Sequence, residues 1–369
     1  MLRQMSWVSE RTWAVGLVLV VVVATFMTAS CRGDRPTLES DAYRDKVHGA
    51  WAAMMVANHS GLPIEGLWID EPGPGDQIDL TLLDEWSTDD DTHVEWLDLH
   101  ILETHGLEPT YEQIRDEWVD HLNGDIWVAT RAARDLMDDG VVPPDTGDPE
   151  LNPLAGWSIG AQLQTEIFGL MAPGHPDEAA RRAEYFALVN ARGPAVDASR
   201  FYARVIAEAF IEDDVESLLV RARLAEGDDS VVAPIFDDVF VWHRDNPDDW
   251  RATRELIRQK YDNDPDFWGS RVNFASTVLA LLYGEGDLRA TLDIAGLAGW
   301  DNDNNMTTAA GVIGVIVGFD QLPEPFASAT DVYFNEDLSG DLPQYDSVQN
   351  IAARTAALGE QIVAPLNAG

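Results

Sequence analysis

Apolar side chains recur at intervals of three and four residues along most of this 369-residue sequence, which is the spacing of a helix buried on one face. The alternation of apolar and polar residues that marks a half-buried strand is almost absent. The sequence therefore predicts an all-α protein. The predicted helices cover residues 37–58, 93–104, 111–122, 129–138, 161–171, 176–190, 197–211, 215–225, 250–261, 274–283, 287–297, 306–319 and 347–363.

The loops between these helices do not divide the chain into domains. The longest, residues 66–80 and 138–157, are rich in Pro, Gly and Asp, but the segments that flank them share one composition. A hydrophobic fraction of 46% provides enough apolar side chains for a large core. We expect a single domain over residues 41–369, and we expect it to be a monomer.

The first 30 residues have the character of an export signal and not of a folded element. Two arginines precede an apolar run over residues 13–27, and two small residues come directly before Cys31. We expect a lipoprotein-type signal peptide over residues 1–30, a lipid anchor at Cys31 and a tether over residues 31–40. The protein would then be exported and held on the extracytoplasmic face of a membrane. An uncleaved membrane anchor is the alternative, although the run is shorter than the roughly 20 residues that span a bilayer comfortably.

Acidic residues outnumber basic ones, 65 to 24, and the formal net charge is −41. Such a chain repels nucleic acid and anionic lipid headgroups, so nucleic acid is excluded as a partner. The charge by itself does not indicate a particular chemistry.

Two acidic clusters each precede a helical pattern. Asp89, Asp90 and Asp91 are consecutive, and charges this close repel one another by about 1 kcal/mol per pair even in water. Asp301 and Asp303 precede a segment that is small or apolar on every side, which predicts burial. Buried carboxylates are costly unless they are paired or bind metal, and hard divalent cations prefer oxygen ligands. The sequence therefore indicates a shared cation site, with an ordinary charged helix N-terminus as the alternative for the first cluster.

Other metal and nucleotide sites fit the sequence poorly. An EF-hand that began at Asp301 would need Gly and Glu where this chain has Met306 and Val312. The sequence has no P-loop, no zinc-type His pair and no Gly-x-Ser-x-Gly elbow, and its eight His are scattered. Zinc and serine-hydrolase chemistry therefore have no support in the sequence.

Three separated motifs resemble the ADP-ribosylglycohydrolase family, in the family's order. GAWAAMMVANHSGLPIEG, residues 49–66, resembles the opening Gly-rich helix that ends in Gly-x-Pro-x-Glu, with Asn58 where the family has Asp. DDDT, which begins at Asp89, resembles the Thr-Asp-Asp-Thr signature with Asp in place of the first Thr. GWDNDNN, residues 299–305, resembles the Gly-Asp-x-Asp-Thr signature, with Asn304 in place of Thr.

The resemblance implies a single compact, multi-helix orthogonal bundle. It also implies a metal-dependent hydrolase that cleaves an N- or O-glycosidic bond of an ADP-ribosyl or related ribosyl substrate. Two Mg²⁺ ions, or Mn²⁺ in their place, would grip the ribose hydroxyls and activate water. The implied metal ligands are Asp89, Asp90, Asp91, Asp301, Asp303 and Asn304. The implied catalytic residues are Glu65, Asp90 and Asp303.

A fourth segment, residues 157–183, resembles the family's Gly-x-Gly-Ala helix start. Backbone amides at a helix N-terminus can cradle a phosphate. The implied substrate-binding residues are Ser158, Gly160, Ala161, Gln162 and Asn190, the last of which stands where the family has His. The departures at Asn58, Asn190 and Asn304 support an alternative function, in which an exported, non-catalytic module on the same fold binds a nucleotide-like or sugar ligand.

Overall fold

Helices make up nearly all of the regular structure in the computed structural model, which describes the chain except for residues 1–39, 83–85, 125, 329–331, 336 and 368–369. The all-α prediction is confirmed. Over the described residues the α-helices are α2 (Ser40–Gly61), α3 (Asp90–His105), α4 (Tyr111–His121), α5 (Val128–Asp138), α6 (Glu166–Leu170), α7 (Pro176–Ala187), α8 (Pro194–Ala209), α9 (Val215–Glu226), α10 (Ala233–Asp245), α11 (Trp250–Tyr261), α12 (Ser270–Gly284), α13 (Leu288–Ala298), α14 (Asn302–Val317) and α15 (Val348–Asn367). Two short strands, β1 (Tyr333–Phe334) and β2 (Tyr345–Asp346), pair antiparallel, with Tyr333 opposite Asp346.

Two parts of the helix prediction are wrong. Helix α10 has no counterpart among the predicted helices, and the predicted helix over residues 161–171 is a 3₁₀ turn (Gln162–Gln164) followed by the short helix α6. The predicted signal peptide over residues 1–30, and residues 31–39 of the predicted tether, lie outside the described residues. Leu38–Gly369 form one compact unit. In the part of the chain that the structure describes, no helix combines the length and hydropathy needed to cross a bilayer.

Local capping chemistry accounts for several helix boundaries. Thr110 forms a capping box at the start of α4. Asp249 and Asp287 each accept a backbone N–H in the first turn of α11 and α13, which satisfies one of the donors that a helix N-terminus leaves unpaired. Gly299 and Gly318 have positive φ and directly follow α13 and α14, a conformation that glycine adopts readily.

At the centre of the fold, α2 and α14 pack backbone to backbone. A Cβ on Gly49 would lie 2.7 Å from the carbonyl oxygen of Gly314, and a Cβ on Gly61 would lie 2.3 Å from Cα of Asp303. The residue numbers rise along α2 as they fall along α14, so the two helices are antiparallel. Because glycine alone permits this approach, the C-terminal end of α2 rests directly on the N-terminal end of α14.

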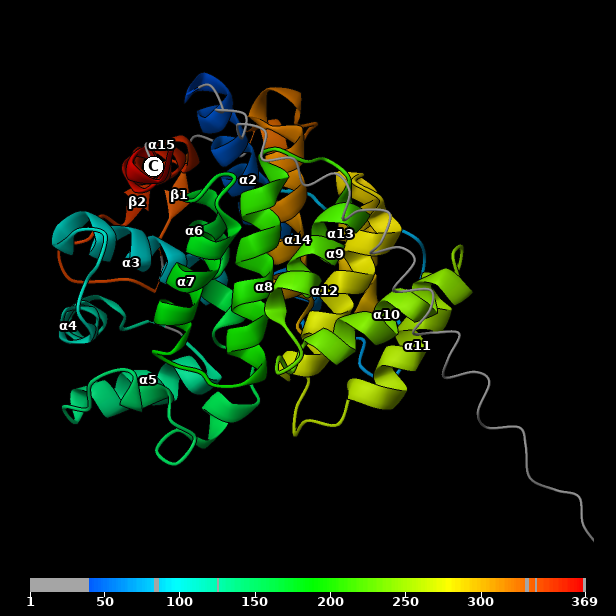
Figure 1. Ribbon diagram of the computed structural model, residues 1–369, viewed down its shortest axis with the longest axis horizontal. Helices are drawn as coiled ribbons and strands as arrows, with labels where there is room; N and C mark the ends of the chain where they lie inside the picture. Colours follow the sequence, from blue (N-terminus) through cyan, green and yellow to red (C-terminus); the bar gives the residue numbers. More distant parts are fainter. Residues whose placement is uncertain (1–39, 83–85, 125, 329–331, 336, 368–369) are drawn as a thin grey trace, which may run out of the picture. The chain divides into compact units, whose positions relative to one another are not determined.

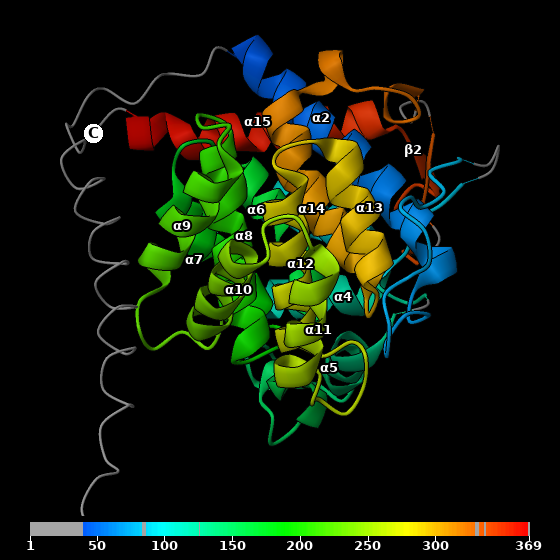
Figure 2. The same cartoon turned by 90° about the vertical axis from the view of Figure 1, so that its right-hand side faces the viewer.

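The other helices surround this central pair. Helices α3, α4 and α5 lie on one side of it, and α10 and α11 lie on the other (Figure 1). Turned by 90°, the structure shows α12 and α13 beside α14 (Figure 2). Large aromatic side chains fill the interior, and among the fully buried ones are Trp51, Trp96, Trp118 and Trp300. The core therefore holds the N-termini of α3 and α14 at fixed positions.

Candidate metal centre

The N-termini of α3 and α14 carry the two acidic clusters of the sequence. Helix α3 begins at Asp90, and its N-cap is Asp89, whose carboxylate accepts the N–H of Asp91 at 3.3 Å. Helix α14 begins at Asn302, and its N-cap is Asp301. Both helix N-termini carry the partial positive charge that favours nearby carboxylates.

The fold brings these carboxylates into two groups that share one residue. We call Glu65, Asp301 and Asp303 the first triad, and Asp89, Asp91 and Asp303 the second triad. Within each triad, one oxygen of every carboxylate lies within 4.8 Å of the others. Asp303 belongs to both, so its carboxylate lies between two clusters of negative charge.

Burial makes these negative charges costly. Four carboxylates of the centre are at most 7% exposed: Asp90, Asp91, Asp301 and Asp303. Burial raises the pKa of all four well above the usual range of an aspartate, and neighbouring carboxylates raise it further. Glu65 is exposed and Asp89 is half-buried, so the centre opens to solvent on their side. The pKa of each is raised all the same, because the side of the carboxyl that faces the centre is shielded from water, and the charge of Asp89 raises the pKa of Glu65 further.

The residues present fit a divalent cation. Oδ1 of Asp303 is buried and, among the described residues, has no hydrogen-bond partner. Buried polar atoms are nearly always satisfied, and a cation coordinated by oxygens would satisfy this one while it offsets the repulsion within both triads. The acidic groups can therefore hold a metal ion.

Two amide side chains position the second triad. Nδ2 of Asn58 donates to Oδ1 of Asp89 at 2.9 Å and to Oδ2 of Asp91 at 3.1 Å, while its oxygen accepts the N–H of Asp89 at 3.1 Å. Nδ2 of Asn304 donates to Oδ1 of Asp91 at 3.1 Å, which leaves its amide oxygen for a cation. Asn58 therefore belongs to the centre, although the motif alone marks it only as a departure from the Asp of the family pattern.

Backbone contacts hold Glu65 next to α14. The N–H of Gly66 donates to the carbonyl of Trp300 at 3.0 Å. Trp300 has a φ of 63°, which is uncommon for a bulky residue. The guanidinium of Arg254 lies 4.1 Å from its ring centroid, and Arg254 also donates to the carbonyls of Ala298 and Trp68 at 3.0 Å. Arg254 therefore ties the loop after Glu65 to the segment before Asp301, and the sequence carries no signal for this role.

Asp90, a predicted ligand, lies outside both triads. Its Oδ2 accepts the backbone N–H of Trp127 at 3.3 Å, at the N-cap of α5. The side chain of Trp127 is 60% exposed. Asp90 is thus tied to the backbone of a residue with an exposed aromatic ring, and the sequence carries no signal for this contact.

The predicted phosphate cradle has a different local structure from the one expected. No α-helix begins at Ser158–Gln162; the N–H groups of Ser158 and Gln162 donate to the carbonyls of Leu154 and Ile159 at 3.0 and 2.6 Å. Predicted residues Gly160 and Ala161 are buried with them. The expectation that Ser158 and Gln162 offer free amides is therefore corrected.

Asn190, the remaining predicted substrate-binding residue, is fully buried. Its Nδ2 donates to Oγ1 of Thr130 at 3.0 Å and to the carbonyl of Gly160 at 3.2 Å. Thr130 lies three residues after Trp127, so Asn190 links the 158–162 segment to the start of α5.

Comparisons with known proteins agree with this architecture. A sequence model of the ADP-ribosylglycohydrolase family matches residues 39–361. No curated protein matches the sequence. Among solved structures, a chain of an "ADP-ribosylglycohydrolase-related protein complex" superposes with a TM-score of 0.58 at 18% identity, and the match covers 87% of this chain and 99% of that one. At that identity the likeness shows the fold.

Proposed function

Because the chain belongs to the ADP-ribosylglycohydrolase family, we propose that it is a cation-dependent hydrolase of N- or O-glycosidic bonds to ADP-ribose or a related ribosyl group. The observation that carries the proposal is the pair of acidic triads that share Asp303 and open to solvent at Glu65 and Asp89. A two-cation site explains why the fold buries so many carboxylates together, because bound cations would offset their mutual repulsion.

The proposed ligands are the carboxylate oxygens of Asp89, Asp91, Asp301 and Asp303 and the amide oxygen of Asn304, whereas Glu65 stays free of the cations. Carboxylate and amide oxygens suit Mg²⁺ and Mn²⁺. When bound, the cations would bind ribose hydroxyls and lower the pKa of a water molecule. Asn58 would keep Asp89 and Asp91 oriented, because a ligand held by outer hydrogen bonds binds its metal more tightly.

Glu65 is the proposed general base. It is exposed at the open side of the centre, next to Asp301 and Asp303. Its pKa is raised by burial of part of the side chain and by the charge of Asp89, which brings the carboxyl nearer to the pH at which it works. Glu65 would take the proton from the attacking water, and the buried carboxylates would stabilise positive charge that develops at the anomeric carbon.

The exposed ring of Trp127 is the proposed surface for the substrate's base or for the leaving group. The backbone N–H of Trp127 donates to Oδ2 of Asp90 at 3.3 Å, and the residue is 60% exposed. A flat aromatic face favours stacking of another planar group. Of the predicted catalytic residues, Asp90 is thus assigned to positioning, and Asp303 to cation binding.

The test is release of ADP-ribose from ADP-ribosyl-arginine and ADP-ribosyl-serine in the presence of Mg²⁺ or Mn²⁺. Glu65→Gln should lower kcat by about 100-fold or more, since a general base contributes about 10²–10⁴, while ADP-ribose binding measured by calorimetry persists. The matched control is Glu71→Gln, an exposed glutamate six residues further on. Absence of turnover with either cation would overturn the hydrolase, and ligand binding without turnover would favour the non-catalytic module.

We also propose that the protein is an exported lipoprotein anchored at Cys31. The support is the apolar run over residues 13–27 and the small residues directly before the cysteine. Replacing Cys31 by Ser should abolish incorporation of a labelled fatty acid. Labelling that persists in this variant would contradict the anchor, and membrane retention without labelling would favour an uncleaved span.

A further inference from the structure

We propose that the chain carries a second metal site of different chemistry, for a borderline transition-metal ion such as Zn²⁺, formed by His100, Glu117 and His121. The site goes beyond the proposed hydrolase. His100 lies nine residues after Asp91 on α3, about 14 Å along the helix axis from the acidic centre. Glu117 and His121 lie one turn apart on α4.

The distances between these side chains match a tetrahedral metal site. Nε2 of His100 and Nε2 of His121 lie 3.2 and 3.1 Å from the same oxygen of Glu117, Oε2. One ligand atom from each of the three residues lies within 4.8 Å of the others. Zinc bound tetrahedrally at about 2.0–2.1 Å from nitrogen or oxygen separates its ligand atoms by about 3.3 Å. The three side chains are therefore close to coordinating positions already.

The tautomer of His121 points to a cation between these atoms. Nδ1 of His121 lies 3.0 Å from the carbonyl oxygen of Ser339 and donates to it. In the neutral ring Nε2 then carries a lone pair and can only accept a hydrogen bond. It faces Oε2 of Glu117, a carboxylate oxygen that can likewise only accept one. The ring of His100 lies 5.1 Å from that of His121 and faces the same oxygen. One metal ion would satisfy the lone pairs of His121 Nε2 and Glu117 Oε2, and Nε2 of His100 faces the same position and can add its own lone pair.

The surroundings fix these ligands as outer hydrogen bonds do in metal sites. Nε2 of His105 lies 2.6 Å from Oε1 of Glu117, the oxygen that does not face the other two imidazoles. The N–H of Ser339 donates to the carbonyl of His121 at 2.8 Å. Gly340 has a φ of +77°, and a Cβ there would lie 2.7 Å from Nδ1 of His121. The loop is thus closely fitted to the imidazole.

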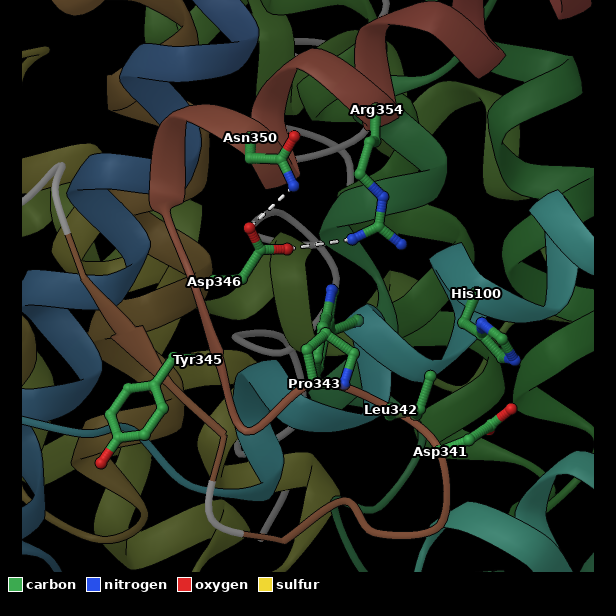
Figure 3. Close-up of a pocket in the computed structure, with 9 residues that line it drawn as sticks. His100, Asp341, Leu342, Pro343, Tyr345, Asp346, Asn350 and Arg354 are labelled. Atoms are coloured by element: carbon green, nitrogen blue, oxygen red, sulfur yellow. Dashed lines mark hydrogen bonds and ion pairs between the residues drawn. The ribbon is translucent and has the colours of Figure 1, made fainter.

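Asp341 supplies a fourth ligand from the same loop. Its Oδ1 lies 3.7 Å from Nε2 of His121, and its side chain is 92% exposed and free to approach. Figure 3 shows His100 on α3 and Asp341 on the loop that leads to β2, on facing elements. An open groove of about 620 Å³, which these residues line together with Asp120, gives an ion direct access. A metal ion would therefore join α3, α4 and the loop.

Titration of the full chain with Zn²⁺ and Co²⁺ in excess Mg²⁺ tests the site, because excess Mg²⁺ competes for the carboxylate centre proposed above. We expect one equivalent of Zn²⁺ to bind and to raise the unfolding temperature. Co²⁺ should give the intense visible absorption of a tetrahedral ion. His100→Gln and His121→Gln should each weaken Zn²⁺ binding by about 100-fold or more, since loss of an outer-sphere partner alone costs about 10- to 100-fold.

The matched control is Asp120→Asn, which removes one negative charge from the same groove but no proposed ligand. It should leave Zn²⁺ affinity within about threefold, which is the change expected from an exposed charge at physiological salt. Equal weakening in Asp120→Asn and His121→Gln would show diffuse charge attraction and overturn the site. A Co²⁺ spectrum that shows only the weak absorption of an octahedral ion would also overturn the site. Unfolding temperatures without added metal show whether each variant is folded, and all measurements are independent of hydrolase activity.

Discussion

Replacing Asp303 by Asn should stabilise the protein when divalent cations are removed, although it should also abolish activity. Asp303 is the carboxylate common to both triads, and it is 2% exposed. Asparagine has the same shape, and its amide can donate where the carboxylate could only accept. The substitution therefore removes charge from the centre of the cluster without opening a cavity.

The magnitude follows from the spacing of the triads. At a separation of 4.8 Å and an effective dielectric constant of about 20, two ionised carboxylates repel by about 3.5 kcal/mol. Burial and the neighbouring carboxylates raise the pKa values of Asp91 and Asp303, so proton uptake offsets part of this repulsion. We expect a net gain of about 2–3 kcal/mol in the free energy of unfolding, or about 3–4 °C in Tm for a domain of this size.

Thermal unfolding followed by circular dichroism, with chelator and with Mg²⁺, measures the effect. In chelator Asp303→Asn should melt above the parent protein, and with Mg²⁺ the order should reverse because the variant loses cation binding. Asp76→Asn, which neutralises an exposed aspartate, is the control for net charge. A variant that melts below the parent in chelator, or that keeps the full stabilisation by Mg²⁺, would refute the reasoning.

Three further predictions concern the same centre. In chelator, stability should fall as the pH rises above about 4, which is the unfolded pKa of an aspartate. The folded pKa values of the buried carboxyls lie above that value, so the native state binds more protons and loses this stabilisation as they are released. A flat or rising profile of Tm against pH would contradict this. Asn58→Asp should cost about 2 kcal/mol without cation, because it replaces two donated hydrogen bonds by repulsion, and Mg²⁺ should restore the loss in denaturant titrations. Gly61→Ala should cost about 1–3 kcal/mol and most of the activity, because its Cβ would lie 2.3 Å from Cα of Asp303, whereas the control Gly156→Ala, whose Cβ meets only ordinary contacts, should change neither.

The helices were predictable wherever capping residues and periodicity agree. Helix α11 matches its prediction at both ends because Asp249 caps it and its apolar positions keep one face. Helix α10 escapes prediction because residues 239–242 are four consecutive apolar residues, β-branched or aromatic, which show no 3.6-residue period. Helix α14 begins four residues before its predicted start at Met306, since Asn and Asp are poor helix formers in general.

Some residues of the candidate site could likewise be predicted from the sequence, and others could not. Asp301 and the Asp89–Asp91 cluster stand out because a run of acids before an apolar helix is unusual, and the structure places both at helix N-termini. Other contacts could not be predicted, because they join segments far apart in sequence. Examples are the hydrogen bond from Asn58 to Asp89 and the packing of the Arg254 guanidinium on the ring of Trp300. The eight His are scattered along the chain, yet the fold gathers His100, His105 and His121 around one glutamate. Only Glu117 and His121, four residues apart, give a local signal for that cluster.

The close contact between α2 and α14 also sets the order in which the protein can become functional. The second triad takes Asp89 and Asp91 from the first third of the chain and Asp303 from the last third, and these meet only when the glycines of α14 dock on α2. A chain truncated before residue 301 would carry half of the acidic centre and no partner for it. Pairing over so long a stretch is slow relative to local helix formation. Activity would therefore appear only after nearly the whole chain has been made, and cation uptake would report completion of folding.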